Sequence, residues 1–255
     1  MDTTRHRGKV AIITGAGSGI GAATAVRMAA EGATVVGVDV NAEGLEKVRA
    51  QIEEAGGEVT IVTADITDQE AVDRVVQTTL ERYGRIDVLA NIAGIMDWFL
   101  PAHELDDETW RRVMAVNVNG PMLLMRATLP VMMRQKAGAI VNVGSVGGLR
   151  GAAAGFAYTT SKHALVGMTK SVAWAYREEG IRANLVAPGG VETGIGSTSV
   201  PRSEWGMAQL GPIHATATRM AQPDEIATLV SWLASDEASN VNGAVVTADG
   251  GWTAG

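Results

Sequence analysis

Short apolar runs alternate along the chain with longer amphipathic stretches, and this alternation limits the fold more than any other feature. The runs are rich in Val and Ile, and most are continuously apolar, which is typical of parallel strands buried on both faces. They cover residues 9–14, 34–39, 58–63, 86–91, 138–144, 181–187 and 244–248. Because helical patterns separate them, the sequence predicts an α/β fold: a doubly wound, seven-stranded parallel sheet with helices on both faces.

The stretches between these runs have helical periodicity, and several follow a residue that can cap a helix. They cover residues 20–31, 42–55, 68–83, 107–135, 157–179 and 222–235, with Asn41, Thr67 and Asp106 as expected caps. The stretch 188–221 departs from this rhythm, with scattered Gly, Ser and Thr, and we expect it to be a lid over a substrate-binding site. No repeat or linker divides the chain, so the sequence predicts a single domain over 1–255.

Composition excludes several classes of function. The formal net charge is −7, which gives no electrostatic footprint for a nucleic acid. The chain has no cysteine and its 4 histidines lack ligand spacing, so disulfides and metal sites are not expected. The first residues lack the apolar core of a signal peptide, and no run approaches the ~18 apolar residues of a membrane span. We therefore expect a cytoplasmic protein that binds a small molecule, with no metal, no nucleic acid and no membrane as partner.

Residues 14–21, TGAGSGIG, place glycines between the first predicted strand and the first predicted helix. At such a crossover the first N–H groups of the helix attract a phosphate, and residues without side chains let it approach. The pattern G-x-G-x-x-G/A fits only as Gly17, Gly19 and Ala22. The pattern T-G-x-x-x-G-x-G fits better, as Thr14, Gly15, Gly19 and Gly21. The turn indicates dinucleotide binding, although tight packing of strand on helix would also use glycines.

Asp39 ends the second predicted strand, where a carboxylate about twenty residues past the glycines can accept hydrogen bonds from the ribose of adenosine. The same side chain could instead cap the next helix, a role that Asn41 would fill equally well. A carboxylate repels the 2′-phosphate of NADP. No cation follows Asp39 or lies in the glycine turn, so the residues predict NAD as the cofactor.

Ser145, Tyr158 and Lys162 can carry acid–base chemistry. Tyr158 and Lys162 are four residues apart in a predicted helix, so their side chains lie on one helical face. An ammonium beside a phenol favours the phenolate, so Lys162 is expected to lower the pKa of Tyr158. Ser145 can hold a substrate oxygen while Tyr158 takes or gives its proton, which would interconvert an alcohol and a carbonyl. By itself, however, such a pair is most often an exposed helix pair.

Taken together, the motifs of this chain resemble those of the short-chain dehydrogenase/reductase family, and the resemblance covers essentially the whole chain. The motifs are TGAGSGIG at 14–21, AD at 64–65, NIAG at 91–94, VNVNG at 116–120, the Tyr158–Lys162 pair and PGGVET at 188–193. Ile92 departs from the family pattern N-N-A-G, while the retained Asn91 has a sheet-stabilising role in the family. The resemblance implies a Rossmann-type fold, a homotetramer, and reversible hydride transfer between a secondary alcohol and NAD.

The resemblance also implies roles for individual residues. In the family, Asn117 bends a helix and holds a water in the proton relay behind Lys162. Asp65 would touch the adenine, and Val191 and Thr193 would meet the nicotinamide amide. The implied catalytic residues are Asn117, Ser145, Tyr158 and Lys162, with Tyr158 as the general acid/base. The implied cofactor-binding residues are Gly15, Ser18, Gly19, Ile20, Asp39, Asp65, Ile66, Asn91, Ala93, Gly94, Tyr158, Lys162, Pro188, Gly189, Val191 and Thr193.

The substrate is expected to be mostly apolar, because large apolar side chains are frequent in the segments that would flank the site. The candidate wall residues are Met96, Trp98, Phe99, Leu149, Arg150, Phe156, Ile195, Trp205, Met207, Leu210, Ile213 and Met220. Those within 188–221 could equally pack onto the body of the protein. Arg150 could bind an anionic group or be solvated, which keeps a 3-oxoacyl-carrier-protein reductase as the alternative within the family.

Two other classes share parts of this pattern. A methyltransferase also has a doubly wound sheet and a glycine loop, but it gives Tyr158 and Lys162 no role. A non-catalytic dinucleotide-binding protein would need the glycines and Asp39 but not the serine, tyrosine, lysine and asparagine together. The presence of all of them favours an oxidoreductase.

Overall fold

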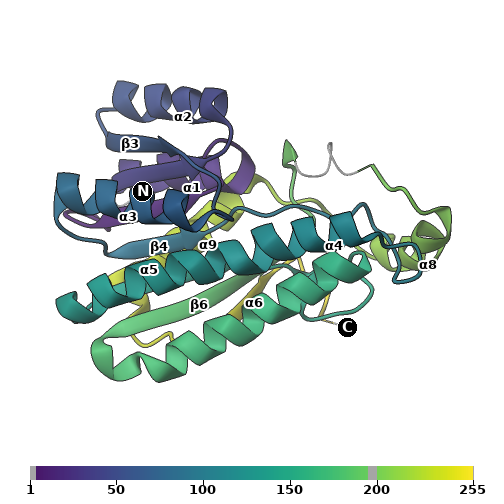
Figure 1. Cartoon of the computed structure of the whole chain (residues 1–255). Helices are drawn as coiled ribbons and strands as arrows, with labels where there is room; N and C mark the ends of the chain where they lie inside the picture. The colour runs from purple at the N-terminus through teal and green to yellow at the C-terminus, as the bar shows by residue number, and fades with distance from the viewer. Residues whose placement is uncertain (1–3, 195–199, 255) are drawn as a thin grey trace.

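The structure, a computed structural model, describes residues 4–194 and 200–254. Seven parallel strands form one sheet in the order β3-β2-β1-β4-β5-β6-β7. Figure 1 shows this sheet with β3, β4 and β6 labelled. The strands are β1 (Val10–Thr14), β2 (Thr34–Asp39), β3 (Glu58–Thr63), β4 (Val88–Asn91), β5 (Gly138–Val143), β6 (Ile181–Pro188) and β7 (Val245–Ala248). The predicted α/β fold is confirmed, and the strand order reverses between β1 and β4, which is where such sheets bind ligands.

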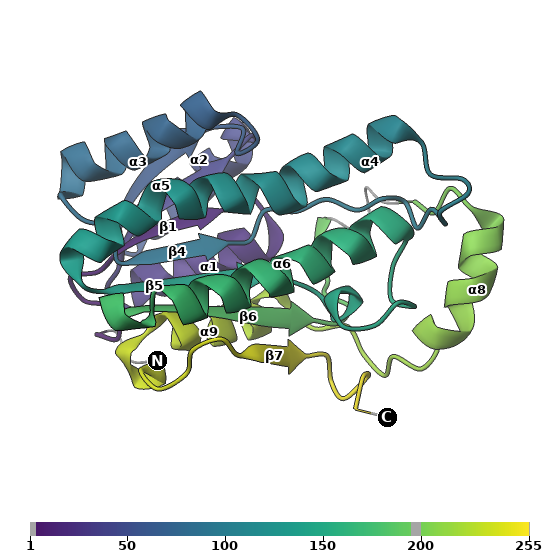
Figure 2. The same ribbon diagram turned by 60° about the horizontal axis from the view of Figure 1, so that its bottom comes forward.

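Helices cover both faces of the sheet, as Figure 2 shows. On one face lie α1 (Gly19–Ala30), α2 (Ala42–Glu54) and α9 (Pro223–Ala234). On the other lie α3 (Gln69–Tyr83), α5 (Gly120–Gln135) and α6 (Phe156–Ala175). Alternate residues of β1 enter the two cores, Ile12 on the α3, α5 and α6 side and Ile13 on the α1, α2 and α9 side. Burial on both faces explains why the predicted strands are continuously apolar.

Two predicted helices are not uniform. The stretch 107–135 consists of α4 (Asp107–Met114), a π-helical turn (Ala115–Asn119) and α5. The stretch 157–179 ends as α6 at Ala175 and continues as a short 3₁₀ helix over Arg177–Glu179. Gly180 then adopts a φ of 73° and ends the helical conformation.

Two of the three predicted capping residues cap a helix in the structure. The side chain of Asn41 accepts a hydrogen bond from Gly44 N, and that of Asp106 accepts one from Thr109 N. The expected cap at Thr67 is wrong, because Asp68 precedes α3 and its carboxylate accepts from Glu70 N. Asp and Thr are both favoured at the residue that precedes a helix. Helix α3 begins at Gln69, one residue later than the predicted helix, so Asp68 takes the capping position in place of Thr67.

The stretch 188–221 contains a helix that the sequence pattern did not predict, α8 (Glu204–His214). Ser203 caps it by accepting a hydrogen bond from Gly206 N at 2.8 Å. Two glycines and Pro212 lie inside α8, and these residues disfavour helix in isolation. The helix lies beyond the carboxyl ends of β6 and β7 in Figure 2. Across the described residues, none of the helices is both long and apolar enough to span a membrane.

Candidate functional site

A cavity of about 460 Å³ lies at the carboxyl ends of β1, β2 and β4, where the strand order reverses. We call it the glycine-turn cavity. Ten of the predicted cofactor-binding residues line it, namely Gly15, Ser18, Gly19, Ile20, Asp39, Asp65, Ile66, Ala93, Gly94 and Thr193. Residues that the sequence did not single out complete the wall, among them Val40, Ile95, Arg112 and Val116.

The backbone of the glycine turn requires glycine at two positions. Gly15 has a φ of +68°, and a Cβ there would lie 3.0 Å from Ala93 N. A Cβ at Gly21 would lie 2.0 Å from the carbonyl oxygen of Gly15. Ser18 precedes α1, but its side chain makes no capping hydrogen bond. The turn therefore combines close backbone contacts with a helix amino terminus that its own serine does not cap, an arrangement that suits a phosphate.

Asp39 joins the glycine turn to the end of β2. One carboxylate oxygen accepts a hydrogen bond from Gly17 N at 2.9 Å, and the other accepts one from Asn41 N at 2.9 Å. The side chain of Asn41, rather than that of Asp39, caps α2. Of the two roles considered for Asp39, capping is thus taken by its neighbour, and the carboxylate faces the glycine-turn cavity.

A second cavity, of about 360 Å³, adjoins the first and contains Tyr158. We call it the tyrosine cavity. The predicted site residues that line it are Ile20, Gly94, Ser145, Tyr158, Lys162, Pro188, Gly189, Val191 and Thr193. Ile20, Gly94 and Thr193 line both cavities. The hydroxyl oxygen of Thr193 is buried without a hydrogen-bond partner in the structure. A dinucleotide with a phosphate at the glycine turn and a carboxamide at Thr193 fits these residues.

Ser145, Tyr158 and Lys162 converge at the end of β5. Ser145 caps a 3₁₀ turn, since its hydroxyl accepts a hydrogen bond from Gly147 N at 3.0 Å. Lys162 donates a hydrogen bond to Val143 O at 3.0 Å, and its Nζ lies 5.4 Å from the centre of the Tyr158 ring. Tyr158 and Lys162 are both buried, so the Tyr–Lys pair is not the exposed helix pair that the spacing alone could indicate.

Burial dominates the ionisation of this pair. It raises the pKa of Tyr158 to about 12, while hydrogen bonding with Ser145 lowers that pKa and the charge of Asp97 raises it. Burial also lowers the pKa of Lys162 to about 8. The net shift in the pKa of Tyr158 is opposite to the sequence expectation, because desolvation and the charge of Asp97 disfavour the phenolate more than the hydrogen bond with Ser145 favours it. Near neutral pH, the side chain of Tyr158 is therefore in the phenol form.

Asn117 and Asn91 lie behind the cavities rather than on their walls. The amide of Asn117, in the π-helical turn, donates to Ile95 O at 2.9 Å and accepts from Ile95 N at 2.9 Å. A Cβ at Gly94 would lie 3.3 Å from Lys162 Nζ and 3.4 Å from Asn117 Oδ1, so both groups lie close to Gly94. Asn91 donates to Asn142 Oδ1 at 2.8 Å and joins β4 to β5, which places it beneath the predicted cofactor site.

Comparisons with known proteins agree with this geometry. A family model described as enoyl-(acyl carrier protein) reductase matches residues 15–253. A 3β-hydroxysteroid dehydrogenase 2 of Eggerthella lenta is 39% identical over 259 residues, with 100% of both chains covered. The crystal structure of levodione reductase matches with a TM-score of 0.90 and 39% identity, over 98% of this chain and 99% of that one.

The chain belongs to the short-chain dehydrogenase/reductase family. It is an oxidoreductase that acts on CH–OH or ketone groups. Members with solved structures hold nicotinamide dinucleotides. A short-chain dehydrogenase from Mycobacterium paratuberculosis bound to NAD matches with a TM-score of 0.91 and 30% identity, over 98% of this chain and 100% of that one. A putative NAD(P)-dependent gluconate 5-dehydrogenase from Beutenbergia cavernae, with NADP at low occupancy, matches at 0.87 and 35%, over 100% of both chains.

The tyrosine cavity of this short-chain dehydrogenase/reductase has mostly apolar walls. Of the candidate wall residues, Met96, Phe99 and Met220 line it. Sequence reasoning missed Ala153, Ala154, His214, Ala217 and Trp252, which also line it. The ring of His214 lies edge-on to those of Phe99 and Trp252, with centroids 5.8 and 5.9 Å apart. Trp252 reaches the cavity from the C-terminal tail, a contact between distant segments that local patterns do not show.

Most other candidate wall residues have structural partners elsewhere. Trp98 lies between the guanidinium groups of Arg112 and Arg202, at 4.1 and 3.5 Å from its ring centre. Phe156 packs against Trp110, and Trp205 packs against His103. Met207, Leu210 and Ile213 belong to α8 and are absent from the described lining of the cavity. Ile195 lies outside the described residues.

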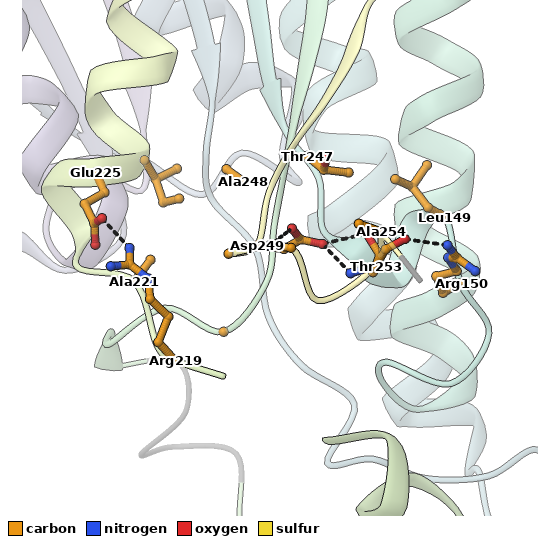
Figure 3. Close-up of a pocket in the computed structure, with 14 residues that line it drawn as sticks. Leu149, Arg150, Arg219, Ala221, Glu225, Thr247, Ala248, Asp249, Thr253 and Ala254 are labelled. Carbon is orange, nitrogen blue, oxygen red and sulfur yellow. Dashed lines mark hydrogen bonds and ion pairs between the residues drawn. The ribbon is translucent and has the colours of Figure 1, made fainter. Parts of the chain in front are cut away.

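Leu149 and Arg150 line a third cavity, the tail cavity, of about 670 Å³ between the C-terminal tail and the start of α9 (Figure 3). Arg150 donates to Thr253 O at 2.6 Å, and Asp249 accepts from Thr253 N at 2.9 Å. Arg219 pairs with Glu225. These polar groups bind one another, as Figure 3 shows, so Arg150 is not a wall residue of the tyrosine cavity.

Proposed function

We propose that this chain is an NAD-dependent oxidoreductase that interconverts a secondary alcohol and a ketone, with Tyr158 as the general acid/base. The observation that carries the proposal is the convergence of Ser145, Tyr158 and Lys162 in a cavity that adjoins the glycine-turn cavity. NAD bound across both cavities would accept hydride from the alcohol carbon or return it to the ketone. Asp39 lines the part of the site expected to hold the adenosine ribose.

Residues of this chain would bind the substrate oxygen and transfer its proton. Ser145 would hold the substrate oxygen, and Tyr158 would give a proton to it or take one from it. Lys162, fastened to Val143 O, would keep a positive charge beside the phenol. Asn117, which like Lys162 lies close to Gly94, would continue the path of the proton away from Tyr158. Because burial raises the pKa of Tyr158 to about 12, Tyr158 would be protonated near neutral pH, which is the form that gives a proton to a ketone oxygen.

The walls support an apolar cyclic substrate. Phe99, Met220 and Trp252 face the tyrosine cavity, and flat rings pack well against aromatic and thioether groups. The relatives named for a hydroxysteroid and for levodione are consistent with ring ketones. Arg150, the residue that kept a 3-oxoacyl-carrier-protein reductase as the alternative, is held by the tail at Thr253 O. It is therefore not placed to bind a carrier phosphate in this cavity.

A panel of substrates tests the proposed function. The purified protein is incubated with NADH and cyclic apolar ketones, open-chain ketones and a 3-oxoacyl thioester, while the absorbance of the reduced nicotinamide is followed. We expect the highest kcat/KM with the cyclic apolar ketones, and oxidation of the matching alcohols that accelerates as the pH rises. Activity confined to the thioester would favour the carrier-protein alternative. Cofactor binding without turnover of any of these compounds would favour a non-catalytic protein.

We also propose that residues 188–221 form a lid over the substrate within a single domain spanning 1–255. The base of the segment is fixed, since Glu192 N and Ala221 N donate hydrogen bonds to Ala221 O and Gly190 O at 2.9 and 2.8 Å. Its far part carries α8, whose His214 lines the tyrosine cavity. NADH and substrate are expected to slow proteolysis within 188–221 several-fold, because ligand contacts would order the segment. Equal cleavage rates with and without ligands would contradict the proposal.

A homotetramer is the expected assembly. The exposed fraction of Trp174, on α6, is 71%, and Met133, on α5, is also exposed, so these helices present apolar side chains that a second copy could cover. We propose that α4, α5 and α6 pair across one two-fold axis and that the C-terminal tail lies near another. Light scattering at micromolar concentration should give four times the mass of the 26.5 kDa chain. A monomer under these conditions would rule the assembly out.

A further inference from the structure

Asp97 lies at the amino end of the helix that carries Tyr158. Its carboxylate follows β4 in the chain and is completely buried, with an exposed fraction of 0%. One oxygen accepts a hydrogen bond from Tyr158 N at 2.9 Å. Gly155 makes room for it, because a Cβ there would lie 2.4 Å from Asp97 Oδ1. The residue before α6 supplies no capping side chain, so Asp97 caps α6 from a position 61 residues away in sequence.

The same carboxylate holds the turn that places Phe99. Its second oxygen accepts a hydrogen bond from Phe99 N at 3.2 Å. Trp98 and Phe99 have φ angles of 53° and 60°, a left-handed conformation that is unfavourable for bulky residues and persists only where surrounding contacts impose it. Leu100 O accepts from Phe156 N at 2.9 Å, so this turn is attached to the start of α6 twice. Phe99 in turn lines the tyrosine cavity.

The charge of Asp97 also acts on Tyr158. It raises the pKa of Tyr158, whereas hydrogen bonding with Ser145 lowers it. The other titratable side chains near Tyr158 within the described lining of its cavity are Lys162, from α6, and His214, from α8. A cation near the phenol favours the phenolate, and the carboxylate of Asp97 favours the phenol. Burial raises the pKa of Asp97 itself, but hydrogen bonds from several backbone N–H groups oppose that shift.

We propose that Asp97 is a positioning residue for the reaction proposed above: by accepting hydrogen bonds from Tyr158 N and Phe99 N, it holds the first turn of α6 in place relative to the turn that carries Phe99. The inference rests on the proposed role of Tyr158. It assigns to one buried carboxylate the orientation of the first turn of α6, and the charge of that carboxylate adds to the effect of burial on the phenol. A carboxylate that served only to stabilise the fold would affect the unfolding temperature but not the titration of Tyr158.

Asp97→Asn tests the inference, because the amide has the same shape but no charge, and its one oxygen can accept only one of the two hydrogen bonds from Tyr158 N and Phe99 N. We expect the titration of Tyr158 to move to lower pH. The chain has only 3 tyrosines, so the difference in phenolate absorbance between each protein and the same protein carrying Tyr158→Phe isolates this titration. We also expect the pH profile of alcohol oxidation to shift the same way and kcat to fall ~10-fold, since small displacements of a reacting group have large effects on rate. The dissociation constant of NADH should be unchanged.

Asp106→Asn is the matched control. Asp106 caps α4 by accepting a hydrogen bond from Thr109 N, so this variant removes the same charge from the start of another helix. It should leave the titration of Tyr158 and the pH profile of alcohol oxidation unchanged. Asp97→Ser, whose hydroxyl can cap α6 without charge, is the second variant and should also titrate at lower pH. Unchanged Tyr158 titration in both variants would overturn the inference, as would a failure of both to fold. If instead Tyr158→Phe alone is fully active, the proposed function fails first, whatever the Asp97 variants show.

Discussion

Tyr158→Phe is expected to lower kcat at least ~100-fold, the scale of a lost general acid/base, and to leave NADH binding nearly intact. The substitution removes only the hydroxyl from a ring that is buried at the start of α6. Phe keeps the shape of that ring, so the walls of the cavity and the position of Lys162 should persist. NADH binding is followed by its fluorescence, and turnover by the absorbance of the reduced nicotinamide. More than a few per cent of the original activity would remove Tyr158 from the mechanism.

Tyr83→Phe is the control for removing a tyrosine hydroxyl. Tyr83, at the end of α3, forms a hydrogen bond of 2.6 Å with Thr60, far from the tyrosine cavity in the chain and absent from its described lining. Its loss should cost about 1 kcal/mol of stability and leave kcat unchanged. The pair of variants therefore separates a chemical role of the hydroxyl from a general effect on folding.

The sheet and most helices could be predicted because their pattern is local. A strand covered on both faces must be continuously apolar, and β1 illustrates this with Ile12 and Ile13 in opposite cores. The glycine turn could also be predicted from the sequence, because Gly15 and Gly21 occupy positions where a Cβ would meet backbone atoms. Helix α8 was not predicted because Gly206, Gly211 and Pro212 have low helix propensity. Its position depends instead on contacts such as that between Arg202 N and Trp98 O.

Parts of the candidate site could not be predicted because they depend on contacts between distant segments. Asp97 and Tyr158 are 61 residues apart, and Trp252 reaches Ile213 O and Thr216 from the C-terminal tail. The desolvation of Tyr158 and Lys162 could not be predicted either, because it depends on how the folded chain surrounds them. The sequence shows that Lys162 lies one helical turn from Tyr158, but not that both are buried deeply enough for burial to raise the pKa of Tyr158 and lower that of Lys162.

Preference for NAD over NADP by at least tenfold in kcat/KM is the second large effect we expect. The carboxylate of Asp39 lines the glycine-turn cavity, where it can accept hydrogen bonds from the ribose hydroxyls of NAD. The 2′-phosphate of NADP would place a second negative group there, which costs about 1 kcal/mol in water and several when partly desolvated. Tenfold corresponds to about 1.4 kcal/mol. The neighbouring positions in the cavity wall hold Ser18 and Val40, and the guanidinium of Arg112, the cation in the described wall, lies over the ring of Trp98.

Asp39→Ala should narrow this gap mainly by weakening NAD. Because Asp39 also accepts a hydrogen bond from Gly17 N, the variant loosens the glycine turn, and kcat/KM should fall with both cofactors but more with NAD. Asn41→Ala is the matched control, since it removes the cap of α2 through Gly44 N and should lower stability by about 1 kcal/mol without changing the ratio. Comparable kcat/KM for NAD and NADP in the unmutated protein, on any working substrate, would show that Asp39 serves the turn alone and does not select the cofactor.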